Sequence, residues 1–244
     1  MLILAGLGIS NEEGLTLEEI KEAKDSDYVF LESYTSIWLG SAENLEKAIG
    51  KKVEILRRSD LEENVDKIIQ LAKTKKVIIF VPGDPLAATT HSSIILECKK
   101  RGINFKIIHN SSIFSAIFET GLHPYKFGQP FTIPLKEKVK GNLDSIINGI
   151  KENKKRGLHT LCLLDIDVEN NKFLEVRDAI KFLLENDIIE DNEKIVVASC
   201  IGSKYQKIIW EEAGKIVNMN LRLPAVVIVT GVLHFSEKEM LENF

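Results

Sequence analysis

The chain has 244 residues, of which 44% are hydrophobic and 28% charged, and its formal net charge is −4. This composition is typical of a globular protein with one large core or two smaller ones, and the charge favours no nucleic-acid partner. No apolar run approaches the ~20 residues of a membrane span, and the start, Met1 to Gly8, predicts a first strand rather than a secretion signal. The three widely separated cysteines predict neither disulfides nor a metal site, and they indicate a reducing cytoplasm.

The first half of the chain alternates predicted strands with predicted helices, which is the pattern of a parallel α/β sheet with right-handed crossovers. A capping box of Thr16 and Glu19 marks the start of the first helix. Short runs rich in β-branched residues predict strands at residues 2–7, 28–32, 53–56, 77–81 and 105–108. Helical spacing of apolar residues predicts the first three helices at residues 16–24, 45–49 and 61–73.

The first predicted strand ends in Gly6-Leu7-Gly8, a Gly-x-Gly sequence that is also found in dinucleotide-binding loops. The third glycine of that fingerprint would fall at Asn11, which disfavours the dinucleotide interpretation. The two glycines still allow a ligand or a packed helix to approach the backbone closely.

The second half of the chain has fewer regular crossovers, which predicts a mixed sheet. The fold class is therefore α/β with two α/β domains, at residues 1–109 and 110–244, and a ligand cleft is expected between them. Helices are predicted at residues 113–120, 143–155 and 176–185, and strands at residues 131–134, 160–165, 195–199, 208–217 and 225–230.

The sharpest feature of the first half is Pro82-Gly83-Asp84-Pro85, which follows the buried strand at residues 77–81. Two prolines and a glycine predict a rigid turn, and Thr89, Thr90 or Ser92 is expected to cap a helix that runs to about Arg101. Ligands of open parallel sheets bind beyond the carboxyl ends of the strands, where this loop is expected. Asp84 either completes the turn or is held rigidly against a ligand, and spacing alone does not decide between the two.

The chain lacks the common motifs of catalytic and phosphate-binding sites. It contains no phosphate-binding P-loop, no H-E-x-x-H zinc motif and no G-x-S-x-G nucleophile elbow. Its five histidines are isolated in the sequence and are interpreted as structural: His91, His109, His123, His159 and His234. An enzyme with this sequence would depend mainly on a bound cofactor and on positioning.

Several stretches together resemble the diphthine synthase family, within the tetrapyrrole-methylase-like class of S-adenosylmethionine-dependent methyltransferases. The Pro-Gly-Asp-Pro turn resembles the wider class, and the other stretches point to the diphthine branch over essentially the whole chain. The resembling stretches are Gly6-Leu7-Gly8, residues 32–36, 82–86, 88–91, 112–113, 120–123, 125–128, 157–161 and 164–166, Gly231 and Leu233-His234.

The resemblance implies methyl transfer from S-adenosyl-L-methionine, with S-adenosyl-L-homocysteine as product, to the amino group of the modified histidine of translation elongation factor 2. This is a step of diphthamide biosynthesis, and archaeal-type members of the family are expected to transfer three methyl groups. The resemblance also implies a homodimer with an interdomain cofactor cleft, and no nucleic-acid or membrane partner. The alternatives are methylation of a tetrapyrrole by the same fold, and a non-catalytic ligand-binding module.

Position by position, the resemblance also implies which residues contact the cofactor, and it implies no metal ligand. The chain departs from the family at Val232, where a lysine is usual, around Ser199, and in a shorter loop after Pro134. The expected cofactor contacts are Ile9, Asp84, Ala87, Ser112, Ile113, Leu164, Ser199, Cys200 and His234.

The chemistry of methyl transfer to an amine predicts no single essential acid or base. An unprotonated amine needs only to be aimed at the methyl carbon, and alignment can supply several kcal/mol, on the order of 7 or more in well-oriented cases. Asp84 is therefore expected to position rather than to react. A quaternary ammonium product favours aromatic neighbours, and Tyr34, Tyr125 and Phe127 are candidates that could equally be packing residues.

Overall fold

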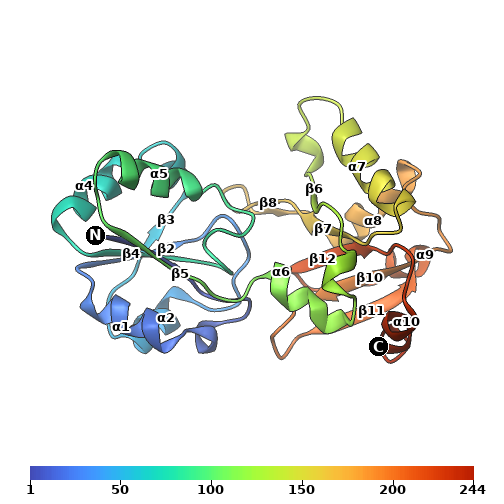
Figure 1. Ribbon diagram of the computed structural model, residues 1–244, viewed down its shortest axis with the longest axis horizontal. Coiled ribbons are helices and arrows are strands. Elements are labelled where there is room, and N and C mark those ends of the chain that lie inside the picture. Colours follow the sequence, from blue (N-terminus) through green and yellow to red (C-terminus); the bar gives the residue numbers. More distant parts are fainter. The chain divides into compact units, whose positions relative to one another are not determined.

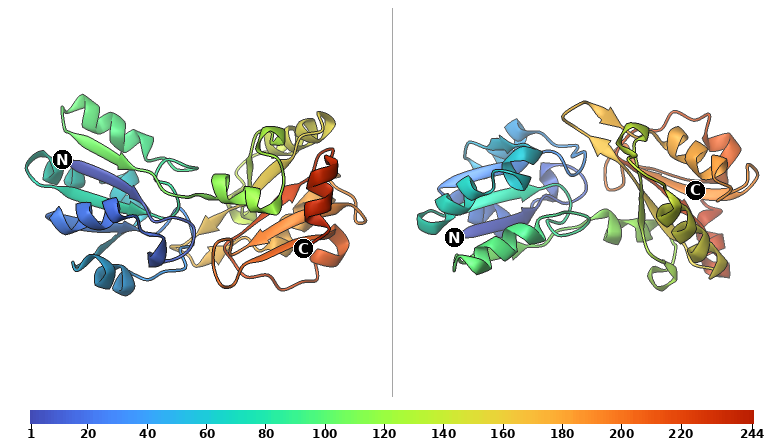
Figure 2. Two further views of the ribbon diagram at one scale, coloured as in Figure 1. Left: turned by 60° about the horizontal axis from the view of Figure 1, so that its bottom comes forward. Right: turned by 90° about the horizontal axis from the view of Figure 1, so that it is seen from above.

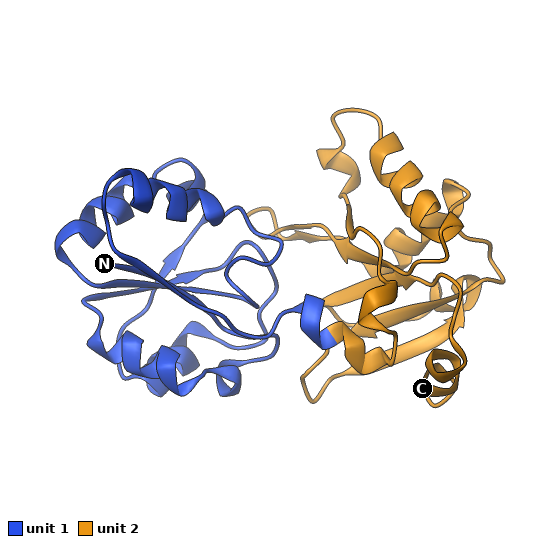
Figure 3. Ribbon diagram, viewed as in Figure 1, with its two compact units in different colours: residues 1–116 blue, residues 117–244 orange.

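Two five-stranded sheets organise the chain, one in each of two units, Met1–Ala116 and Ile117–Phe244 (Figures 1 and 3). The structure is a computed structural model that describes all residues from 1 to 244. The predicted boundary after residue 109 lies in the connection just before this division. That boundary, and the cleft expected between the domains, stay predictions.

The sheet of the first unit is entirely parallel, as predicted, with the order β3-β2-β4-β1-β5. The central strands β1 and β4 run in register from Leu2 beside Val77 to Gly6 beside Val81, so their carboxyl ends lie side by side. The strands are β1 (Leu2–Gly6), β2 (Tyr28–Glu32), β3 (Glu54–Leu56), β4 (Val77–Val81) and β5 (Phe105–Ile108).

Helices cover both faces of this sheet (Figures 1 and 2). On one face, α1 (Leu17–Asp25) and α2 (Ala42–Ile49) bury Ala23, Leu45 and Ile49 against the strands. On the other face, α4 (Asp66–Thr74) and α5 (Ser92–Lys100) do the same with Ile69, Ile94 and Cys98. Every residue of β4 is buried, because both of its faces are covered.

Two details of the predicted helices are wrong in the first unit. The helix expected at residues 61–73 is split into α3 (Arg58–Glu62) and α4, because the backbone and side-chain amides of Asn64 both donate to the Ser59 carbonyl and end the first helix. The residue before α5 is His91, and no side chain caps this helix. The hydroxyl of Thr89 instead donates to the Pro85 carbonyl, 2.8 Å away.

The sheet of the second unit is mixed, as predicted, with the order β11-β10-β12-β7-β6. Only β6 and β7 are parallel; the other neighbours are antiparallel. The strands are β6 (Phe131–Ile133), β7 (Thr160–Leu164), β10 (Lys194–Ser199), β11 (Lys207–Glu212) and β12 (Ala225–Val229), and a separate hairpin joins β8 (Ile166–Asp167) to β9 (Lys172–Phe173).

The helices of the second unit are mostly short. The strand expected at residues 208–217 ends at Glu212, because the chain then forms one helical turn, α9 (Ala213–Ile216), which buries Ala213 and Ile216 completely. The predicted helix at 113–120 changes from α6 (Ile113–Ala116) to a 3-10 turn at the division between the units. The remaining helices are α7 (Asp144–Lys155), α8 (Val176–Glu185), α9 (Ala213–Ile216) and α10 (Phe235–Leu241), with 3-10 turns at Glu12–Gly14, Ile117–Thr120, Pro124–Lys126 and Lys136–Lys138. None of these helices has both the length and the apolar character needed to cross a bilayer.

Candidate functional site

Three loops meet at the carboxyl ends of β1, β4 and β5 in the first unit. Gly8 and Gly83 exchange both of their backbone hydrogen bonds, at 3.1 and 2.9 Å, so the loop after β1 is joined directly to the Pro-Gly-Asp-Pro turn after β4. The third loop, which follows β5, begins at His109. This is the end of a parallel sheet at which ligands bind.

The glycines of these loops allow the close approach. Gly8 and Gly83 have φ angles of +71° and +73°, in the left-handed region that favours glycine. A Cβ on Gly6 would lie 2.5 Å from the Gly83 carbonyl oxygen and 2.7 Å from the Asn110 Cβ, so no side chain fits there. In this chain the Gly-x-Gly sequence therefore allows the loop after β1 to pack closely against the loops after β4 and β5.

Asp84 completes its turn, one of the two roles that the sequence left open, and also binds a neighbouring loop; contact with a ligand stays a prediction. Its Oδ1 accepts a hydrogen bond from the Leu86 amide at 2.9 Å, which completes a turn within its own loop. Its Oδ2 accepts from Nδ1 of His109 at 2.7 Å and from the Asn110 amide at 3.3 Å. The carboxylate, 14% exposed, thus ties the loop after β4 to the loop after β5.

Asn110 is a residue of this site that the sequence analysis did not identify. Its side-chain nitrogen lies 3.0 Å from the Gly14 carbonyl and 3.2 Å from both carboxylate oxygens of Glu19. Burial raises the pKa of Glu19, against the opposing hydrogen bonds from Thr16 and Asn110. No local pattern indicates these contacts, because the partners lie more than 90 residues apart in the sequence.

The predicted cofactor contacts of the first unit gather around the same loops. Ile9 directly follows Gly8, and Ala87 lies on the loop of Asp84. Ser112 is buried against Gly83, with Ile113 beginning α6 after it. Ala88, next to Ala87, has a φ of +55°, and such strained non-glycine residues cluster at functional sites.

Of the three aromatic candidates, only Tyr125 is free of packing, with 98% of its surface exposed. Tyr34 is 3% exposed, and burial together with the Glu32 carboxylate raises its pKa. Its hydroxyl lies 3.4 Å from Nε2 of His91, whose Nδ1 lies 3.1 Å from the Pro85 carbonyl. Tyr34 therefore supports the rigid loop from inside the core, while Phe127 packs edge-on against two neighbouring rings.

The predicted contacts of the second unit fall at two different ends of its sheet. Leu164 and Ser199 end β7 and β10, and both flank the start of β12. Cys200 follows with a φ of +50° and donates its amide to the Pro224 carbonyl at 2.7 Å. His234 instead follows the far end of β12, so within this unit the structure does not bring it to the other three.

A second polar cluster, also missed from sequence, surrounds the fully buried Glu237 on α10. Its Oε1 accepts from the His123 amide at 2.8 Å and from Nε2 of His159 at 3.0 Å. Its Oε2 accepts from the His234 amide at 2.7 Å and from the Lys126 ammonium at 2.5 Å. Three of the histidines that looked isolated therefore meet around one carboxylate.

Burial by itself raises the pKa of Glu237, but the four hydrogen bonds outweigh it and lower the pKa to about 2. Burial also lowers the pKa of His159, and the hydrogen bond that its Nδ1 accepts from the Gly231 amide marks the neutral ring. The only hint in the sequence is the spacing of His234 and Glu237, which form a capping box for α10.

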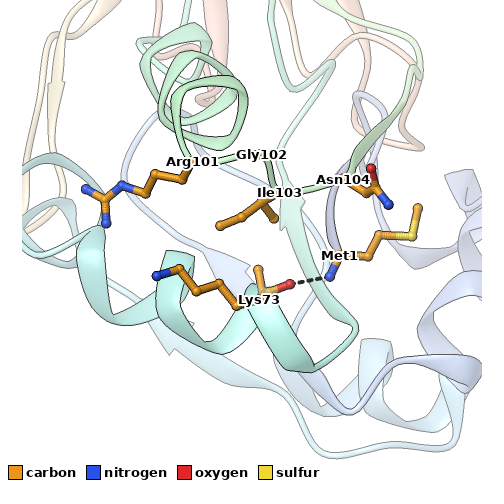
Figure 4. A pocket seen from close by; sticks show the side chains of 7 residues that line it. Met1, Lys73, Arg101, Gly102, Ile103 and Asn104 are labelled. Carbon is orange, nitrogen blue, oxygen red and sulfur yellow. Dashed lines mark hydrogen bonds between the residues drawn. The ribbon is translucent and has the colours of Figure 1, made fainter.

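One pocket of about 200 Å³ lies away from all these residues, at the opposite end of the first sheet (Figure 4). Met1, Lys73 and Asn104 line it, and the α-amino group of Met1 donates to the Ala72 carbonyl there. Nowhere do three histidine, cysteine or carboxylate side chains meet in a way that could hold a metal ion.

Comparison with known proteins agrees with the fold. The family model of the tetrapyrrole (corrin/porphyrin) methylases matches residues 1–216, and the chain therefore belongs to this family of S-adenosylmethionine-dependent methyltransferases. Within it, the chain belongs to the diphthine synthases. It is 39% identical to the diphthine synthase of Methanocaldococcus jannaschii, over 99% of this chain and 98% of that one, and 35% identical to that of Archaeoglobus fulgidus, over 100% and 95%.

Solved structures give the same result. A crystal structure of diphthine synthase matches with a TM-score of 0.90 and 33% identity, over 100% of this chain and 96% of that one. A putative diphthine synthase from Entamoeba histolytica matches with a TM-score of 0.89 and 32% identity, over 100% and 97%. The family resemblance and fold class inferred from sequence are confirmed, and the family implies a methyl donor of the S-adenosylmethionine type.

Proposed function

We propose that this protein transfers methyl groups from S-adenosylmethionine to the amino group of the modified histidine of elongation factor 2, in diphthamide biosynthesis. We further propose that three methyl groups are added to the same nitrogen. The observation that carries this proposal is the junction of three loops around Asp84, in a chain that matches diphthine synthases over nearly its whole length.

The residues at the junction fit S-adenosylmethionine chemically. Asp84 offers a partly exposed carboxylate that can accept a hydrogen bond from an amino or hydroxyl group. A Cβ on Gly83 would come no nearer than 3.9 Å to Ser112 of the loop after β5, so the two loops leave space beside this glycine. Ile9, Ala87 and Ser112 add small or apolar surface nearby, and we propose that these residues hold the donor.

When bound, S-adenosylmethionine supplies a methyl group on a positively charged sulfur, with a neutral thioether as leaving group. The contribution of the chain is rigidity. Pro82 and Pro85 fix their φ angles, His91 holds the Pro85 carbonyl from inside the core, and Asp84 ties two loops together. Such preorganisation keeps reactants in line, which is the main source of acceleration for an uncharged amine nucleophile.

Two measurements test the proposal. Calorimetry should show that S-adenosylmethionine binds the wild-type chain and binds Asp84→Ala at least about tenfold more weakly, as expected for a lost charge-assisted hydrogen bond. Asp25→Ala is the matched control, because Asp25 is an exposed aspartate at the end of α1, and it should bind as the wild type does.

Mass spectrometry of elongation factor 2 carrying the modified histidine should then show stepwise gain of up to three methyl groups. Binding of the donor with transfer to a tetrapyrrole and not to the factor would overturn the substrate assignment. Normal binding and a normal rate in Asp84→Ala would overturn the role of Asp84.

The oligomeric state and the cellular location complete the proposal. We propose a homodimer, as the family resemblance implies, and light scattering after gel filtration should give twice the chain mass. We also propose a cytoplasmic location, which agrees with three free and buried cysteines, Cys98, Cys162 and Cys200. Fractionation of the source cells tests it.

A further inference from the structure

His109 forms a carboxylate–imidazole pair with Asp84 that the proposed function does not yet use. Nδ1 of His109 lies 2.7 Å from Oδ2 of Asp84, while the imidazole is 66% exposed. An ionised carboxylate only accepts hydrogen bonds, so Nδ1 carries the proton. In the neutral ring Nε2 then holds a free lone pair, and no hydrogen bond within the protein engages it.

The sequence predicts no single essential base, but a base beside the site can accept the proton that methylation of a protonated amine releases. An ordinary amino group is mostly protonated at pH 7, since its pKa is about 8, and a protonated amine has no lone pair for the methyl carbon. Each methyl group transferred to an ammonium therefore releases one proton, in all three rounds of a trimethylation.

Of the titratable groups that contact the Pro-Gly-Asp-Pro loop, Asp84 and His91 are already engaged by other partners. Three donors already meet the Asp84 carboxylate, and both ring nitrogens of the buried His91 face Pro85 and Tyr34. The other carboxylate of this hydrogen-bond network is Glu19 on α1, which contacts Asn110 rather than His109. Neither Asp84 nor Glu19 is paired with a lysine or arginine, so no such cation competes with His109 for the Asp84 carboxylate.

We propose that His109 is the proton acceptor of methyl transfer and that Asp84 orients its ring; this rests on the proposed function. The N–H bond of the acceptor's ammonium breaks, its proton bonds to Nε2, and the electron pair stays on nitrogen. That pair forms the new N–C bond as the methyl–sulfur bond breaks, with its electrons staying on sulfur. The exposed imidazolium then returns the proton to water.

Two substitutions distinguish a role of His109 as a base from a role in which it only supports Asp84. His109→Asn keeps an N–H donor near the position of Nδ1 but has no basic nitrogen, and His109→Ala removes both. Because the side chain is largely exposed, both variants should fold. Their rates of methyl transfer to elongation factor 2 are measured from pH 6 to 10, with and without added imidazole, and their affinities for S-adenosylmethionine by calorimetry.

Both variants should lose about tenfold in rate at pH 7, because an amine with a pKa of about 8 is about one-tenth deprotonated there without a base, while donor affinity stays within about twofold for His109→Asn. The loss should shrink as the pH rises and the amine deprotonates by itself, and imidazole should restore part of the rate of His109→Ala. Nitrogen-15 NMR of the wild type should place the proton on Nδ1.

A wild-type rate in His109→Asn would show that His109 only holds Asp84, and a wild-type rate in His109→Ala would exclude any role. A loss that is independent of pH and not rescued by imidazole, or a proton found on Nε2, would also overturn the proposal. Failure of the wild type itself to methylate the factor would instead refute the proposed function.

Discussion

Replacing Glu237 by glutamine tests the second polar cluster most directly. The substitution keeps the shape of the side chain but replaces one of its two acceptor oxygens by an NH2 group, which donates hydrogen bonds. Four donors meet this carboxylate, so the amide group of glutamine must face two of them. Removing one partner of a buried ion pair typically costs 3–5 kcal/mol. Because Lys126 is 27% exposed and can regain water, we expect a loss of about 3 kcal/mol at pH 7.

The same cluster predicts how this loss depends on pH. The pKa of Glu237 is lowered from 4.5 to about 2 in the folded protein. Its contribution to stability is therefore complete above about pH 4.5 and is lost as the pH falls toward 2. Between pH 7 and pH 3 the difference between wild type and Glu237→Gln should shrink by about 2 kcal/mol.

Urea unfolding followed by tryptophan fluorescence measures this effect within the second unit. The chain has two tryptophans, of which Trp210 lies on β11 in the second unit, so a Trp38→Phe background isolates its signal. Glu239→Gln, an exposed position on the same helix, is the control and should change the free energy of unfolding by less than about 0.5 kcal/mol. Equal midpoints for wild type and Glu237→Gln, or a difference that does not change with pH, would refute the reasoning.

Three further predictions concern the first unit and the cysteines. Asn110→Ala removes hydrogen bonds to Gly14 and Glu19 and should destabilise the first unit by about 2 kcal/mol, measured from Trp38 fluorescence with Trp210→Phe; no change would contradict its bridging role. In Gly83→Ala the new Cβ makes only ordinary van der Waals contact with Ser112, so the substitution should cost only the left-handed strain, about 1–2 kcal/mol. In Gly6→Ala the Cβ clashes with the Gly83 carbonyl oxygen, so the cost should be larger; the reverse order would be inconsistent with the loop geometry. Burial raises the pKa of Cys98, and that of Cys162 to about 12, so neither should react with a thiol reagent at pH 8 until urea unfolds the chain.

The sequence by itself determined most of the regular elements. The bounds of β2, β4, β5 and α8 agree with the predicted ranges, because β-branched runs and helical spacing are local signals. Helix breaks were harder to predict. The division of α3 from α4 depends on two hydrogen bonds of Asn64, and the end of β11 depends on burial of Ala213 and Ile216 in the core of the second unit.

The polar networks were decided by the tertiary structure alone. The partners Asp84 and His109 are 25 residues apart in the sequence, and His123 and Glu237 are 114 apart. They meet because strand order places the ends of β1, β4 and β5 side by side, and because α10 packs its carboxylate under the loops before β6 and β7. Spacing reveals which residues share one helix or strand, but hydrogen bonds between separate loops depend on a sheet order that no local pattern encodes.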